Sequence, residues 1–89
     1  MKAVLFYEVA ADGLLKARTH FPAHRAFMEP FHARGELLMI GTFANPADGS
    51  LAVFRDRAAA EAFAAGDPFV REGVVGKWRI MDWNEALVP

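Results

Sequence analysis

The chain has 89 residues, ten basic against eleven acidic side chains, no cysteine, and a 54% share of hydrophobic residues. This length fits one domain, residues 1–89, and the lack of cysteine excludes a disulfide framework and a thiol nucleophile. The near-neutral charge argues against a nucleic-acid partner, and no apolar run approaches the ~18–20 residues of a membrane span. Because the N-terminus also lacks a signal-peptide pattern, we expect a cytoplasmic protein.

The first part of the chain predicts a strand followed by a helix. Lys2–Val9 is rich in β-branched and aromatic residues, which favour a strand. From about residue 14 to 34 the pattern is helical, with Pro22 expected in the first turn and Pro30 expected to kink the helix. Gly35 is the expected C-cap residue.

The rest of the chain predicts a hairpin, a second helix, a short turn and a final strand. Asp-Gly inside residues 45–50 is a strong hairpin signal, Asp56 is typical of an N-cap, and the alanines after it favour a helix. The expected elements are strands at Glu36–Phe43 and Leu51–Arg55, a helix at Arg57–Ala65, a single turn of helix from Asp67 toward Gly73, and a strand at Gly76–Trp83.

This element order, β-α-β-β-α-β, predicts an α+β protein of the ferredoxin-like class. In that fold, two helices cover one face of a four-stranded antiparallel sheet, and alternation along the strands should leave the other face polar. Here both faces are apolar, because in each of the first three strands apolar residues point to both sides. In the first strand Ala3, Leu5, Tyr7 and Val9 point to one side, and Val4 and Phe6 to the other. The same holds for Leu37, Met39 and Phe43 against Leu38 and Ile40, and for Leu51 and Val53 against Ala52 and Phe54. A second copy is the simplest cover, so we expect a homodimer joined by sheet faces or sheet edges.

His24 is the strongest candidate for chemistry. It lies at helical spacing with Phe27, Met28 and Phe31, so it should point toward the sheet. An inward histidine is either a structural core residue or a general acid/base, and the second role needs a carboxylate to orient the ring. Asp67, at the end of the second helix, is the candidate partner, although it is also a typical turn residue before proline.

Other kinds of site have less support in the sequence. His20 and His24 are four residues apart, but no third metal ligand is evident, so we expect no metal. No glycine-rich phosphate loop follows a strand, which argues against a nucleotide cofactor. From their placement, Thr42, Ser50 or a backbone amide near Gly41 is expected to polarise a substrate carbonyl.

Several segments, in this order and spacing, resemble the YCII-related (YciI-like) family over nearly the whole chain. They are Pro22-Ala23-His24, Gly35-Glu36-Leu37-Leu38 running into Gly41, Asp48-Gly49-Ser50, Ala60-Glu61-Ala62, and Asp67-Pro68-Phe69-Val70 with Gly73-Val74. The resemblance implies a dimeric α+β barrel of ferredoxin-like protomers and an active pair that falls on His24 and Asp67. Phe21 replaces an arginine that many members carry, leaving only the more distant Arg18, and Thr42 replaces a proline.

Together these observations predict a cofactor-free enzyme of lyase or isomerase type. His24 and Asp67 would transfer a proton on a small organic substrate that also contacts Gly41, Thr42, Ser50 and Phe69. The main alternative is a non-catalytic domain that binds a small ligand or a partner and uses His24 structurally. A haem- or oxygen-using monooxygenase of the same barrel fold has little support, because no haem motif appears.

Overall fold

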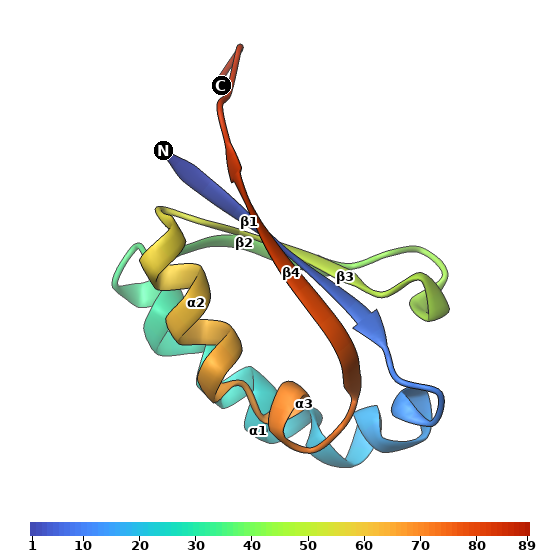
Figure 1. The fold of residues 1–89 in the computed structure, drawn as a ribbon. Coiled ribbons are helices and arrows are strands. Elements are labelled where there is room, and N and C mark those ends of the chain that lie inside the picture. Colours follow the sequence, from blue (N-terminus) through green and yellow to red (C-terminus); the bar gives the residue numbers. More distant parts are fainter.

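The computed structural model describes all residues, 1–89, and consists of one sheet with helices on one side (Figure 1). The strands are β1 (Lys2–Val9), β2 (Leu37–Thr42), β3 (Ser50–Phe54) and β4 (Val75–Trp83), antiparallel in the order β2-β3-β1-β4. The helices are α1 (Gly13–Ala33), α2 (Arg57–Gly66) and the short α3 (Pro68–Arg71), and a 3₁₀ turn, η1 (Pro46–Asp48), lies in the β2–β3 connection. The predicted ferredoxin-like class is confirmed.

Helix α1 differs from the prediction at its N-terminal half. Pro22 lies in the interior of the helix rather than in its first turn, as does Pro30. Both prolines are on the exposed side, where water can bond the carbonyl groups that a proline leaves without an N–H donor. At the other end Arg34 is the C-cap residue, and Gly35, the predicted C-cap, is the next residue, with φ +76°. The N–H groups of Gly35 and Glu36 donate to carbonyls of the last turn, so the helix ends at this glycine as predicted.

Strand β2 contains a register shift that the predicted alternation missed. Between Leu37 and Met39 the pairing with β3 slips by one residue, so that Leu37 lies opposite Phe54 and Ile40 opposite Ala52. Directly opposed residues share a face, so Leu37 and Ile40 both face the helices. The expectation that they point to opposite faces is wrong, because a bulge inserts one residue and resets the alternation.

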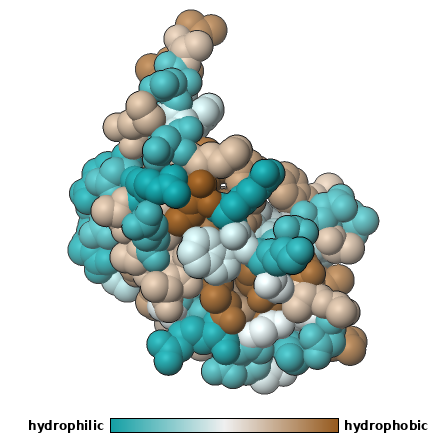
Figure 2. All heavy atoms as spheres, viewed as in Figure 1, coloured by the Kyte–Doolittle hydropathy of each residue, from teal (hydrophilic) through white to brown (hydrophobic).

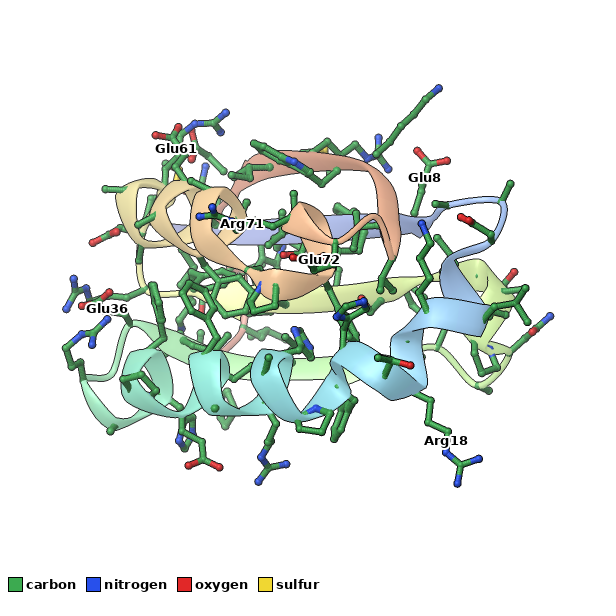
Figure 3. The ribbon with its side chains drawn as sticks, turned by 90° about the horizontal axis from the view of Figure 1, so that it is seen from below. Glu8, Arg18, Glu36, Glu61, Arg71 and Glu72 are labelled. Atoms are coloured by element: carbon green, nitrogen blue, oxygen red, sulfur yellow. The ribbon has the colours of Figure 1, made fainter.

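The core lies between the helices and the sheet, and aromatic rings fill its centre. Phe63 of α2 is fully buried, and its ring centroid lies 5.2 Å from those of Phe27, Phe31 and Phe54. Asp56 begins α2 as predicted, since its side chain accepts a hydrogen bond of 2.9 Å from the Ala59 N–H. Figure 3 shows the side chains of α1, α2 and the strands meeting in this layer.

The opposite face of the sheet carries apolar side chains that no helix covers. Met39 is 65% exposed there, Met81 and Trp83 are also exposed, and Val4 and Val53 lie buried among their neighbours. The C-terminal residues 84–89 extend beyond the sheet, and Leu87 and Val88 on this segment are exposed (Figures 1 and 2). None of the helices has the length and apolar character to cross a bilayer.

Replacing the central core ring tests this account of the packing. Phe63→Ala should lower the free energy of unfolding by about 3–5 kcal/mol, because it removes buried apolar area and leaves a cavity. Leu15→Ala, at an exposed position of α1, is the control and should stay within about 0.5 kcal/mol of the original chain. Urea denaturation followed by circular dichroism measures both, and equal losses would contradict the packing described here.

Candidate active site

The two residues predicted to act together lie in contact. His24 extends from the middle of α1 toward the sheet, and Asp67 lies at the junction of α2 and α3. Nδ1 of His24 is 2.7 Å from Oδ1 of Asp67, and the two residues are 6% and 0% exposed. Packing of α1 beside α3 therefore joins positions that are 43 residues apart in the chain.

The Asp67 carboxylate accepts hydrogen bonds from three segments of the chain. Besides His24, its donors are the Tyr7 hydroxyl, 2.6 Å from Oδ2, and the Phe69 N–H, 3.0 Å from Oδ1. An ionised carboxylate has no proton to donate, so the Nδ1 atom facing it must carry one. In the neutral ring, Nε2 is then the unprotonated nitrogen with a free lone pair.

Nε2 of His24 faces a cavity between α1 and the sheet. It makes no hydrogen bond within the chain, and no buried side-chain nitrogen or oxygen lacks a partner, so Nε2 keeps accessible surface. His24 lines a cavity of about 420 Å³, in the range typical of small-ligand sites. Most of the lining is apolar: Val9, Leu14, Ala17, Phe21, Met28, Ile40, Phe69, Val74 and Val75.

Tyr7 is a site residue that the sequence reasoning missed. Burial, together with the adjacent charge of Asp67, raises the pKa of the Tyr7 phenol well above its ordinary value, so the hydroxyl stays neutral and donates to Asp67. The available signal was weak. Tyr7 falls on the same strand face as Ala3 and Leu5, and a hydroxyl on a face packed under helices needs a polar partner.

Phe69, expected to contact substrate, also packs flat on the imidazole. The rings of Phe69 and His24 are 3.8 Å apart at their centroids with an interplanar angle of 2°. Phe63 approaches the imidazole edge-on, with centroids 6.5 Å apart. The ring plane of His24 is thus fixed by Phe69 on a face and by Asp67 on an edge.

The other expected contact residues, Gly41, Thr42 and Ser50, also line the cavity. Thr42 lies directly opposite Ser50 across the β2–β3 pair, and Ser50 lies opposite Tyr7 across the β3–β1 pair. The hydroxyl groups therefore lie on the face that carries Tyr7, toward the helices. They are neighbours in the sheet.

The charged residues around the cavity are few. Glu8 and Arg25 line it, and Nε of Arg25 is 3.3 Å from the Glu29 carboxylate in an exposed ion pair. Phe21 lines the cavity, whereas Arg18 projects away from the body of the protein (Figure 3). No group of three or more histidine or carboxylate side chains is placed to hold a metal ion.

Comparison with solved structures shows the same fold at low sequence identity. The dehydrochlorinase TftG of Burkholderia phenoliruptrix, in complex with 2,5-dihydroxybenzoquinone, is 20% identical with a TM-score of 0.76, covering 97% of this chain and 96% of its own. PA3566 of Pseudomonas aeruginosa is 19% identical with a TM-score of 0.60 over 97% and 94% of the two chains. A hydroxynitrile lyase of Passiflora edulis is 16% identical with a TM-score of 0.51 over 99% and 95%.

Comparison of the sequence gives the family. No curated protein sequence matches the chain. The model of the YCII-related domain matches residues 1–84, which is nearly the whole chain and includes every residue of the site described above. The protein therefore belongs to the YCII-related family.

Proposed function

We propose that the protein catalyses proton transfer on a small organic molecule, with His24 as general base and acid and Asp67 as its partner. The observation that carries the proposal is geometric: Nδ1 of His24 lies 2.7 Å from the buried Asp67 carboxylate, while His24 lines a mainly apolar cavity of about 420 Å³ and its Nε2 has no partner in the chain. Proton transfer by a positioned histidine contributes typically ~10²–10⁴-fold to a rate. The chemistry is of lyase or isomerase type and uses no cofactor.

In the proposed mechanism Nε2 removes a proton from the substrate. The imidazolium that results stays paired with Asp67, and the negative charge of the carboxylate stabilises the positive charge of the ring. The neutral Tyr7 hydroxyl and the Phe69 N–H keep the carboxylate oriented during this change. Nε2 then returns the proton to the substrate or releases it to water.

The comparisons support this proposal at the level of the fold. A dehydrochlorinase and a hydroxynitrile lyase are among the proteins with similar structures, and one of them is complexed with a small quinone. The same arrangement of helices and strands thus accommodates small-molecule catalysis in those proteins, which favours an enzyme over a non-catalytic binding domain. A cytoplasmic location stays a prediction.

A homodimer is part of the proposal. Met39, Met81 and Trp83 stay exposed on the uncovered sheet face, beside the nearly buried Val4 and Val53. Contiguous apolar surface of this kind marks association sites. The resemblance noted in the sequence implies the same assembly, in which two sheets pack together as an α+β barrel.

Hydrogen exchange tests the proton transfer, and it does not require the product to be identified. In D₂O, a panel of small enolisable carbonyl compounds should exchange C–H for C–D in the presence of the protein, followed by NMR. His24→Gln should slow exchange by about 10²–10⁴-fold, because it removes the base. Asp67→Asn should also slow it, because an amide that presents its NH₂ to Nδ1 favours the tautomer with Nε2 protonated.

The matched control for these variants is His32→Gln, an exposed histidine on the same helix. It should leave the exchange rate unchanged. If His24→Gln exchanges as fast as the original chain, His24 is not the base. If the panel binds and nothing exchanges, the non-catalytic binding domain is the better description.

Alkaline titration tests the Tyr7–Asp67 hydrogen bond. The folded pKa of Tyr7 is raised, so the unfolded chain loses this proton first as the pH rises above about 10. The free energy of unfolding should then fall by up to about 1.4 kcal/mol per pH unit more than in Tyr7→Phe, which lacks this proton. Tyr7 is the chain's one tyrosine, so phenolate absorbance is unambiguous, and its appearance near pH 10 in folded protein would refute the buried hydrogen bond.

Light scattering tests the homodimer. At micromolar concentration the mass should be twice 9.8 kDa, and Met39→Glu or Met81→Glu should shift it toward a single chain, because a charge would be buried at the interface. Leu15→Glu, on the exposed side of α1, is the control and should keep the mass of the dimer. A single-chain mass for the unaltered protein would rule the dimer out.

A further inference from the structure

Two hydroxyl groups in the cavity are free of partners within the protein. Thr42 and Ser50 face each other on neighbouring strands, and neither hydroxyl is hydrogen-bonded to another group of the chain. No buried side-chain oxygen lacks a partner, so the hydroxyl of the half-buried Ser50 keeps accessible surface, and Thr42 is itself an exposed residue. Both residues line the same cavity as His24. They are adjacent hydrogen-bond donors in a mainly apolar wall.

The rest of the lining limits what these donors can bind. The cavity has one acidic and one basic lining residue, Glu8 and Arg25, and Arg25 is already paired with Glu29. A multiply charged anion such as a phosphate ester would find no cluster of cations here. The aliphatic and aromatic side chains favour a compact apolar body with a single polar atom aimed at the hydroxyl pair.

We infer that Thr42 and Ser50 form an oxygen-binding subsite across the cavity from His24, and that the substrate is a small, uncharged, enolisable carbonyl compound. The inference rests on the proposed function and adds the substrate class. Both hydroxyls donate to the carbonyl oxygen, where negative charge develops in the transition state. Hydrogen-bond donors that are already positioned at such an oxygen commonly supply a large part of an enzyme's rate enhancement.

The proton-transfer step conserves atoms and electrons. Nε2 of His24 takes the proton from the carbon next to the carbonyl, and the C–H electron pair becomes a C=C bond. The C=O π pair moves onto oxygen, giving an enolate that Thr42 and Ser50 hold. The imidazolium returns the proton to another carbon of the skeleton in an isomerisation. In an elimination, an anion departs from the adjacent carbon and the proton goes to water.

The hairpin holds the two hydroxyls in place before substrate arrives. Antiparallel register sets Thr42 opposite Ser50, and the β-branched threonine has a restricted χ1. Gly49, with φ +90°, lets β3 pass close to β1, since a Cβ there would lie 2.0 Å from the Tyr7 carbonyl oxygen. The subsite is therefore built on paired strands and not on a free loop.

A pair of matched ring compounds tests the subsite directly. Pentafluorophenol, ionised at neutral pH, places an anionic oxygen on a planar ring as an enolate does, and pentafluorotoluene has a methyl group there instead. Binding of each is measured by ¹⁹F NMR. Thr42→Val and Ser50→Ala should each weaken binding of the phenolate by about 10-fold, the usual effect of one hydrogen bond to a charged group. Binding of pentafluorotoluene should be unchanged.

The control variant is Thr19→Val, which makes the same change on α1 outside the cavity lining and should alter neither affinity. Thr42→Val keeps the side-chain shape and suits a strand, so its fold is expected to persist and circular dichroism checks it. Equal changes for both compounds, or no change for the phenolate, would overturn the subsite.

Comparison with the exchange assay separates this inference from the proposed function. If His24→Gln abolishes exchange while both hydroxyl variants exchange and bind phenolate normally, the subsite fails and the proton-transfer proposal stands. If the hydroxyl variants weaken phenolate binding while His24→Gln exchanges normally, the oxygen subsite stands and His24 is not the base.

Discussion

The rest of this structure depends on the hydrogen bonds that the buried carboxylate of Asp67 accepts. An ionised carboxylate without exposed surface is costly unless its lone pairs are satisfied. Here the donors come from β1, α1 and α3, through Tyr7, His24 and the Phe69 backbone. One charge therefore fixes how the sheet, the long helix and the short helix meet. Because its oxygens have no protons, the same charge determines which nitrogen of His24 is free.

The residues around Asp67 combine stability with chemistry. Asp67-Pro68-Phe69 forms a single turn in which the first side chain binds the edge of the imidazole and the third covers its face. Small displacements of α3 would move both contacts at once, so the orientation of the His24 ring is set by backbone geometry as much as by side chains. A general base needs this kind of fixed orientation toward its substrate.

Much of the fold could be predicted from local patterns, and the errors have definite causes. The hairpin, the Asp56 cap and the Gly35 helix end follow from short-range signals. Pro22 was misplaced because proline favours the first turn of a helix, where its missing N–H has no partner to lose, but it is also tolerated in a helix interior where water can bond the carbonyl left without a donor. Pro22 lies on the exposed side of α1, where this is possible. The bulge near Leu37 depends on pairing with β3, which no alternation within β2 encodes.

The sequence by itself determined the order of elements, the inward direction of His24 and the surplus of apolar residues beyond what the two predicted helices cover. Each of these follows from composition or from periodicity along a single segment. Only the tertiary structure decided that Tyr7 binds Asp67, that Phe69 stacks on His24, and that two hydroxyls line the same cavity. These contacts join segments far apart in the chain. Their geometry comes from helix packing and strand register, which local sequence does not specify.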